Sequence, residues 1–445
     1  MLSKSWHNTC VKRNLYADLV EWKTSSRRKP LLLRGARQTG KTFLLRQFGD
    51  NEYERVVYCD FEEDPALDGF FSRDLDPHRI VAELSVYKGH DIEPERHLII
   101  FDEVQASDRA LTSLKYFHEN AGGYHLAAAG SLLGIKMSRP GSFPVGKVNF
   151  LDLHPMSFLE FLRAMGKPRY AELLLELADP QPLPEAIHSD MVNLLRTYYF
   201  VGGMPEAVRA YAEAGDARVT RQIQREVLDS YLLDFAKHAP AADIPKLGLI
   251  WDSIPKHLAK ENKKFMFSAI KKGARARGYE NALKWLQDAG LVHLCHAVSS
   301  SRSPLKHYAD RSVFKVYALD VGLLGAMART PPEISVQGDR LFTEYRGALA
   351  ENFVAQEFIA GGEPDLYYWR STGGKAELDF LFDAGRIVVP VEVKAGLSRR
   401  SKSLSSYDKQ FAPDVLIRSS LSNLKRDGKI CNVPLYAVCR LRQFV

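Results

Sequence analysis

Short runs of apolar residues alternate with amphipathic segments along the first third of the chain. The runs lie at residues 31–33, 55–59, 98–101, 124–129 and 147–153. Such runs, without polar alternation, are typical of strands buried on both faces of a parallel sheet. After the first run, Phe43, Leu44, Leu45 and Phe48 have the spacing of an apolar helix face, and Gly49 is expected to end that helix. Strands separated by helices predict an α/β fold with a doubly wound parallel sheet.

The middle of the chain has a different pattern, with helical segments joined by turns. Three prolines between residues 180 and 184 mark a boundary, and the Gly202-Gly203 turn precedes a helix that Pro205 can start. A second phosphate-binding nest at this turn stays open as an alternative. From residue 253 to 298, a helix, a connector, a second helix and an apolar strand follow one another. This order predicts a winged-helix-like part.

The last hundred residues return to a mixed pattern. Residues 347–359 predict an amphipathic helix that carries Glu351. Residues 376–382 and 386–394 predict two strands of a hairpin that turns at residues 383–385. This region is therefore expected to be a second α/β unit.

The junction between the first apolar run and its helix carries the strongest motif. Gly35, Gly40, Lys41 and Thr42 have the spacing G-x-x-x-x-G-K-[ST] of a phosphate-binding loop. Glycines let backbone N–H groups surround a phosphate, Lys41 is expected to reach the β- and γ-phosphates of ATP, and Thr42 is expected to bind Mg²⁺. The strand and helix on either side disfavour an empty glycine-rich turn. The expected nucleotide-binding residues are Gly35, Ala36, Arg37, Gln38, Thr39, Gly40, Lys41, Thr42 and Phe43.

Two acids at the end of a later apolar run complete the expected site. Residues 98–103 are LIIFDE, so that Asp102 is expected to bind Mg²⁺ and Glu103 to activate the attacking water. Ser131 follows the next run and is a candidate sensor of the γ-phosphate, although a serine that merely begins a loop fits the sequence nearly as well.

Composition and charge indicate where the protein is located and what it binds. The 445 residues contain ordinary proportions of apolar and charged residues, no apolar run of 18 residues, and five scattered cysteines, which predicts a cytoplasmic protein of several domains without a structural disulfide, zinc site or membrane span. The net charge is +7, and residues 256–284 hold nine Lys or Arg against Glu261 and Glu280. This stretch is a candidate nucleic-acid-binding surface, with a solvated basic face or an acidic protein partner as alternatives.

A second candidate site lies in the C-terminal hairpin. Asp379, Glu392 and Lys394 resemble the D…E-x-K pattern of restriction-endonuclease-like cores, in which carboxylates hold Mg²⁺ and the lysine lies beside the attacking water. Glu351 is the expected third acid. The E-x-K spacing is common by chance, and Pro390 allows a bulge that would turn Asp379 away, so the fold is expected and cleavage is left open.

The motifs together resemble AAA+ type ATPases of bacteria and archaea that are fused to a domain of unknown function. The resemblance is carried by GARQTGKT (35–42), LIIFDEVQ (98–105), AAGSLLG (128–134), LDLHPMSFLEFL (151–162), YYFVGGMPEAV (198–208), KVYALDVGLL (315–324) and RGALAENFVAQE (346–357). It implies the restriction-endonuclease-like fold but not its activity. One departure is Gly146-Lys147 where that pattern has Gly-Arg, so no arginine finger is assigned.

We therefore expect an N-terminal helix and linker at residues 1–30, an ATPase domain at 31–165, a helical and winged-helix-like region at 185–335, and a nuclease-like domain at 340–445. The expected function is ATP hydrolysis coupled to nucleic acid, with DNA favoured. The alternative is an ATP-dependent signalling or assembly switch that binds a protein partner and has an inactive C-terminal domain. Self-association stays open.

Overall fold

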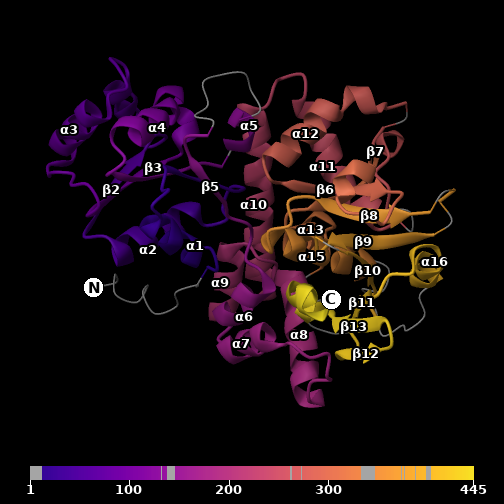
Figure 1. The fold of residues 1–445 in the computed structure, drawn as a ribbon. Coiled ribbons are helices and arrows are strands. Elements are labelled where there is room, and N and C mark those ends of the chain that lie inside the picture. The colour runs from indigo at the N-terminus through magenta and orange to yellow at the C-terminus, as the bar shows by residue number, and fades with distance from the viewer. Residues whose placement is uncertain are drawn as a thin grey trace. The chain divides into compact units, whose positions relative to one another are not determined.

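The computed structural model describes residues 13–131, 133–137, 146–260, 263–271, 273–331, 346–371, 373–374, 376–385, 387–396 and 402–445. The chain forms two compact units (Figure 1). Unit 2 holds Lys12–His154 and Asp288–Gly290, and unit 1 holds Pro155–Gln287 and Leu291–Val445.

Unit 2 is built on a parallel sheet. Its strands are β1 (Leu31–Arg34), β2 (Arg55–Asp60), β3 (His97–Asp102), β4 (His125–Ala129) and β5 (Asn149–Asp152). Their order is β2-β3-β4-β1-β5, and all neighbours are parallel. The parallel α/β sheet predicted from the apolar runs is confirmed.

Helices cover both faces of this sheet, as the alternation of strand side chains requires. Leu31 and Leu33 pack with the face that carries α1 (Tyr16–Thr24) and α2 (Lys41–Glu52). Leu32 belongs to the opposite core. That core includes residues of η1 (Pro65–Phe71), η2 (Val104–Ala106), α3 (Pro77–Lys88), α4 (Asp108–Asn120) and the short α5 (Leu133–Met137).

Two details of α2 differ from the prediction. The helix continues through Gly49 to Glu52, and a Cβ at Gly49 would lie 2.3 Å from Val56 Cγ2 of β2. Glycine is therefore needed for close packing of helix on strand, not for ending the helix. Phe43 is 55% exposed instead of lying on the apolar face, because the first turn of α2 directs it away from the sheet.

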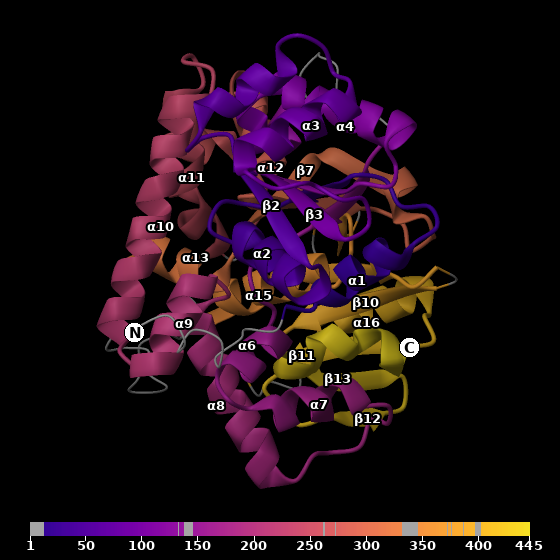
Figure 2. The same cartoon turned by 90° about the vertical axis from the view of Figure 1, so that its left-hand side faces the viewer.

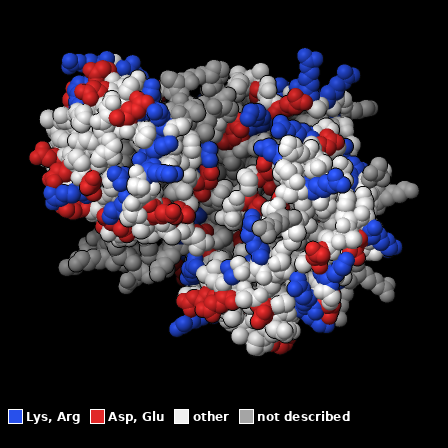
Figure 3. Space-filling model, in the orientation of Figure 1, with Lys and Arg blue, Asp and Glu red and all other residues white. Residues whose placement is uncertain are grey.

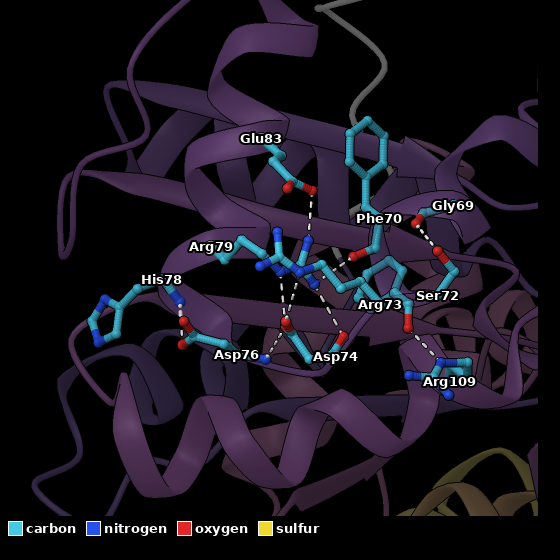
Figure 4. Close-up of polar contacts among 11 residues, drawn as sticks. Gly69, Phe70, Ser72, Arg73, Asp74, Asp76, His78, Arg79, Glu83 and Arg109 are labelled. Atoms are coloured by element: carbon cyan, nitrogen blue, oxygen red, sulfur yellow. Dashed lines mark hydrogen bonds and ion pairs between the residues drawn. The ribbon is translucent and has the colours of Figure 1, made fainter.

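The connection between η1 and α3 is held by one arginine (Figure 4). Arg79 Nε donates to Asp74 Oδ1 at 2.7 Å and Nη1 donates to Glu83 Oε2 at 2.6 Å. Its other terminal nitrogen donates to the carbonyl of Phe70 at 2.9 Å. These charge-assisted bonds order the segment that joins η1 to α3.

Unit 1 begins with a helical region and ends with a mixed sheet. Its helices are α6 (Phe158–Ala164), α7 (Pro168–Glu176), α8 (Glu185–Val201), α9 (Pro205–Ala214), α10 (Ala217–His238), α11 (Ile244–Leu258), α12 (Glu280–Asp288), α13 (Val321–Met327), α15 (Arg346–Ala360) and α16 (Lys402–Phe411). Short 3₁₀ helices are η3 (Phe267–Ala269), η4 (Ala276–Gly278), η5 (Leu305–Tyr308) and η6 (Leu435–Phe444).

The sheet of unit 1 has eight strands in the order β12-β13-β11-β10-β9-β8-β6-β7. They are β6 (Val292–Val298), β7 (Ala309–Ala318), β8 (Leu366–Arg370), β9 (Glu377–Asp383), β10 (Val388–Val393), β11 (Leu416–Ser420), β12 (Lys425–Asp427) and β13 (Ile430–Pro434). Phe380 and Phe382 of β9 contact Phe358 of α15, whereas Leu381 packs in the cluster that includes Leu404 of α16 (Figure 2). The two helices therefore cover opposite faces.

The strand expected to be a wing is part of this sheet. β6 pairs with β7 in antiparallel and with β8 in parallel orientation. Because both edges of β6 are hydrogen-bonded, it is not a free wing. The sheet is continuous across the division expected at residues 335–340. Ala282, Leu283, Leu286 and Ala289 are buried.

The Gly202-Gly203 turn is tied to a buried carboxylate. The N–H of Gly203 donates to Asp320 Oδ2 at 2.6 Å, and a Cβ at Gly203 would lie 2.2 Å from the carbonyl oxygen of Met156. The N–H group that a phosphate nest would need is thus used inside unit 1. Close packing accounts for the second glycine.

A buried acid links α15 to α6. The N–H of Phe158 donates to Glu357 Oε1 at 2.8 Å. Burial, with a smaller effect of the Glu160 charge, raises the pKa of Glu357 to about 8. The folded protein therefore keeps this proton at pH values where the unfolded chain, with an ordinary carboxyl, has lost it.

We expect Glu357→Gln to remove a pH dependence of stability. Because the folded pKa is raised, the wild-type contribution is fully present below about pH 4.5 and is lost as the pH rises to about 8. Between these two pH values, the free energy of unfolding of the wild type should fall by on the order of a few kcal/mol relative to that of Glu357→Gln. Urea denaturation at pH 5 and pH 8 measures the free energy of unfolding of both proteins. The exposed Glu176→Gln should behave as wild type, and equal pH profiles for Glu357→Gln and wild type would contradict the assignment.

Candidate functional site

The phosphate loop leaves β1 in a backbone conformation that glycine permits. Gly35 has φ +151° and Gly40 has φ +91°, and a Cβ at Gly35 would lie 2.2 Å from the carbonyl oxygen of Leu153. Gly40 is also the N-cap of α2, so no side chain caps the first N–H groups of the helix. These donors and the positive end of the helix point toward the loop, as an anion site requires.

Lys41 lies inside the loop. Its side chain is buried, and Nζ donates to the carbonyl oxygens of Gly35 at 3.0 Å and Ala36 at 2.8 Å. Thr42 follows in the first turn of α2 and is half-buried. The ammonium group is therefore held where a phosphate within the loop would meet it.

An arginine that no motif indicated supports the loop from outside. Arg13 is buried and donates to the carbonyl oxygens of Thr39 at 2.8 Å and His154 at 2.5 Å. Thr39 Oγ1 in turn donates to the carbonyl of Ala36 at 2.9 Å. Arg13 thus fixes the peptide that precedes Gly40 from a position 26 residues upstream.

The acids of β3 lie at the same edge of the sheet. Asp102 is buried, and its carboxylate accepts from Tyr58 Oη at 2.9 Å and from the N–H of Glu103 at 3.0 Å. Glu103 has φ +48°, a left-handed conformation that is strained for a residue with a Cβ. Such strain orients the two neighbouring carboxylates differently.

The electrostatics of Glu103 depend on the loop. Burial raises the pKa of its carboxyl, while a hydrogen bond from Gln105 and the charge of Lys41 act in the opposite direction. Glu103 is therefore close enough to Lys41 to feel its charge. An acid with a raised pKa beside a phosphate site is suited to accept a proton.

The remaining residues predicted for this site fall into two groups. Ser131 is buried just after β4, and Ala36 is buried within the loop. Arg37 forms an ion pair with Glu62 at 3.8 Å, while Gln38 and Phe43 are exposed. Strands β1, β4 and β3 are neighbours and run parallel, so their carboxyl ends lie at the same edge of the sheet. The loop, Ser131, Asp102 and Glu103 therefore come together at that edge.

The second predicted site lies in unit 1, where a bulge affects Asp379. Trp369 pairs with Leu378 and Tyr367 pairs with Leu381, so Asp379 and Phe380 face one residue of β8. The pairing of β9 with β10 continues without a shift past Pro390. Asp379 Oδ2 accepts from the N–H of Val393 at 2.8 Å. The bulge therefore does not remove Asp379 from the hairpin.

Glu351 and Asp379 come together with two lysines that the sequence did not indicate. Lys263 donates to Glu351 Oε1, and Lys315 Nζ lies 3.8 Å from Glu351 Oε2 and 3.9 Å from Asp379 Oδ1. Burial opposes the charge of Glu351, but Lys263 and Lys315 hold its pKa below the ordinary value, whereas burial and the Glu351 charge raise the pKa of Asp379.

Glu392 and Lys394 form the adjoining pair. Lys394 Nζ lies 2.5 Å from Glu392 Oε1, and the buried Glu392 Oε2 has no hydrogen-bond partner among the described residues. Burial lowers the pKa of Lys394, but Glu392 most strongly, then Asp379 and Glu351, raise it overall. All four residues predicted for this site thus lie within electrostatic reach of one another.

The described residues contain no disulfide and no side-chain cluster of metal-binding geometry. Among the described residues, no group of three or more His, Cys, Asp or Glu side chains is arranged to hold a metal ion. Cys59, Cys295, Cys431 and Cys439 are free thiols, and Cys10 lies outside the described residues. No helix in the described part of the chain is long and apolar enough to cross a membrane.

The basic stretch lies on the surface of unit 1. Lys271, Arg275 and Arg277 are exposed between α11 and α12, whereas Lys272 lies outside the described residues. Figure 3 shows Lys and Arg side chains over the part of unit 1 that carries α12 and β7, with Asp and Glu side chains among them.

Residue 147 of unit 2 is the position at which the family pattern has an arginine. Here Lys147 forms an ion pair with Glu119, with Nζ 2.9 Å from Oε1.

Three parts of the chain are similar to known families. Residues 27–162 match the AAA domain family, residues 192–333 match a domain of unknown function (DUF8612), and residues 346–438 match another domain of unknown function (DUF4143). No curated protein matches the chain.

Solved structures give distant likenesses. A Walker-type ATPase of Pyrococcus abyssi has 15% identity and a TM-score of 0.46, covering 72% of this chain and 96% of its own. The Aeropyrum pernix ORC1 protein in complex with DNA has 14% identity and a TM-score of 0.31, covering 73% and 93%. AMPPCP-bound DnaA of Aquifex aeolicus has 14% identity and a TM-score of 0.28, covering 62% and 88%. These scores are too low to carry an argument, and residues 27–162 are similar to the AAA domain family.

Proposed function

We propose that unit 2 binds ATP together with Mg²⁺ and hydrolyses it. The observation that carries the proposal is the convergence of the phosphate loop with Asp102 and Glu103 at one edge of the parallel sheet. The match of residues 27–162 to the AAA domain family supports it. A glycine-rich turn that served only packing would not need a buried acid, a half-buried acid and a buried lysine beside it.

The roles follow from the contacts of each side chain. The N–H groups of the loop and Lys41 bind the phosphates, with Lys41 exchanging the carbonyls of Gly35 and Ala36 for phosphate oxygens. Thr42 and Asp102 would hold Mg²⁺, which neutralises the charge that develops on the leaving phosphates. Glu103 accepts the proton of the attacking water once Gln105 releases its carboxylate.

Two variants separate binding from turnover. Lys41→Ala should weaken Mg-ATP binding at least ~10-fold in calorimetry, because a charge-assisted contact is lost. Glu103→Gln should still bind Mg-ATP but hydrolyse it roughly 10²- to 10⁴-fold more slowly, because a general base is lost. The exposed Glu63→Gln is the matched control and should hydrolyse ATP at the wild-type rate. Unchanged affinity in Lys41→Ala, or unchanged turnover in Glu103→Gln, would refute the respective role.

We also propose that the basic stretch of unit 1 binds nucleic acid, with DNA favoured. The supporting observation is that Lys256, Lys260, Lys271, Arg275 and Arg277 are all exposed on neighbouring segments. Such a surface can neutralise backbone phosphates without reading bases. An acidic protein partner, as in a signalling or assembly switch, is the competing proposal. We also propose that the protein is cytoplasmic and that it can self-associate.

Salt dependence distinguishes the two partners. Neutralising Lys271, Arg275 and Arg277 to alanine should weaken binding of a DNA duplex and reduce the slope of log affinity against log salt by roughly 2 to 3. Fluorescence anisotropy at several salt concentrations measures both quantities. The control changes Lys167, Arg169 and Lys306, which are exposed elsewhere on unit 1, and should leave the slope unchanged. Absent DNA binding by the wild type would favour the protein partner.

A further inference from the structure

The carboxylate cluster of unit 1 is centred on a buried lysine. Lys315 of β7 is 1% exposed, and its Nζ lies 2.7 Å from Glu377 Oε1, 3.8 Å from Glu351 Oε2 and 3.9 Å from Asp379 Oδ1. It also lies 4.7 Å from the ring centre of Tyr368. A cation that faces three carboxylates from α15 and β9 stands where a divalent ion would bind the same groups.

Protein groups hydrogen-bond to three of the four carboxylate oxygens of Glu351 and Asp379. Glu351 Oε1 accepts from Lys263, and Oε2 accepts from Tyr317 Oη at 3.1 Å. Asp379 Oδ2 accepts the N–H of Val393, while Oδ1 faces Lys315. Glu392 Oε2 is buried and has no hydrogen-bond partner among the described residues. A divalent ion takes several oxygen ligands, and no group of three or more acidic, His or Cys side chains among the described residues is arranged to hold one.

Lysines already offset most of the charge of the cluster. The ammonium groups of Lys263, Lys315 and Lys394 face the carboxyl groups of Glu351, Glu377, Asp379 and Glu392. Three positive charges thus meet four carboxyl groups, so little negative charge is left for a divalent ion to neutralise in this buried site.

We propose that Lys315 and Lys263 replace the metal ion of a nuclease-like site, so that unit 1 holds a lysine-closed ionic cluster that binds no divalent metal and cleaves no nucleic acid. The metal implied by Asp379, Glu392 and Lys394 does not fit the residues that surround them. The cluster instead connects β7, α15 and β9 with the segment that carries Lys263.

The two lysines differ in how they could be displaced. Lys315 is enclosed, whereas the Lys263 side chain is 14% exposed and comes from the segment that precedes η3. Removing Lys263 therefore frees Glu351 Oε1 next to solvent and takes one positive charge out of the cluster. This variant should create the metal site that the wild type lacks.

Mn²⁺ titration of the nucleotide-free full-length protein, followed by the electron paramagnetic resonance signal of free Mn²⁺, tests the proposal. The wild type should take up no Mn²⁺ in unit 1, and Lys263→Ala should bind one ion with a Kd on the order of 10⁻⁴ M or tighter. Adding Asp379→Asn to Lys263→Ala should abolish that binding, which assigns the ion to this cluster. Lys271→Ala removes an exposed charge from the same basic stretch and should behave as wild type.

Two further variants keep the test decisive. If Lys263→Ala does not fold by circular dichroism, Lys263→Gln removes the charge while keeping a donor for Glu351. Lys315→Met, which removes the central charge at similar volume, should melt at a higher temperature with Mn²⁺ than without it. A wild-type Mn²⁺ site that Asp379→Asn abolishes would overturn the proposal. Folded Lys263 and Lys315 variants that both ignore Mn²⁺ would overturn it too.

Discussion

The close approach of β1 and β5 sets the geometry on which the nucleotide site depends. Leu33 and Leu151 are paired in parallel register, so the chain that leaves β1 at Gly35 passes directly beside the carbonyl of Leu153. No Cβ fits there, and the loop turns back over its own carbonyls, where Lys41 enters. The position of β4 between β1 and β3 then determines where Asp102 and Glu103 can reach. The chemistry of the site is thus a consequence of strand order and of one backbone contact.

Unit 1 depends on buried polar groups that belong to distant parts of the chain. Asp320 accepts from Gly203 and also caps α13 by accepting from Leu323 N–H at 2.9 Å. Gln356 of α15 donates to Tyr198 Oη at 2.8 Å and so joins the same network. A polar group buried without a partner costs more than its hydrogen bond contributes, so such networks admit few alternative arrangements. They therefore specify how the helical region meets the sheet.

The parts of the fold that follow local rules could be predicted from the sequence. The strands and the phosphate loop of unit 2 depend on neighbouring residues, and the hairpin of β9 and β10 depends on a short turn. Arg13, Lys263 and Lys315 could not be predicted, because each acts on residues 26 or more positions away and no periodicity connects them. The pairing of β6 with β8 could not be predicted for the same reason, since β8 lies far along the chain. Phe43 is apolar but exposed, and Gly49 lies inside α2 against β2 and does not end the helix. The residue type alone therefore did not determine the structural role of either residue.

Arg13 has a consequence for where the nucleotide-binding part of the chain can be cut. The family match begins at residue 27, yet the guanidinium that holds the carbonyls of Thr39 and His154 lies 14 residues before that point. A fragment that starts at the matched boundary would leave both carbonyls without this cation and would lose α1, which covers one face of the sheet with Leu19 and Trp22. The smallest fragment that keeps Arg13 and α1 therefore begins upstream of residue 27, where the match to the AAA domain family begins.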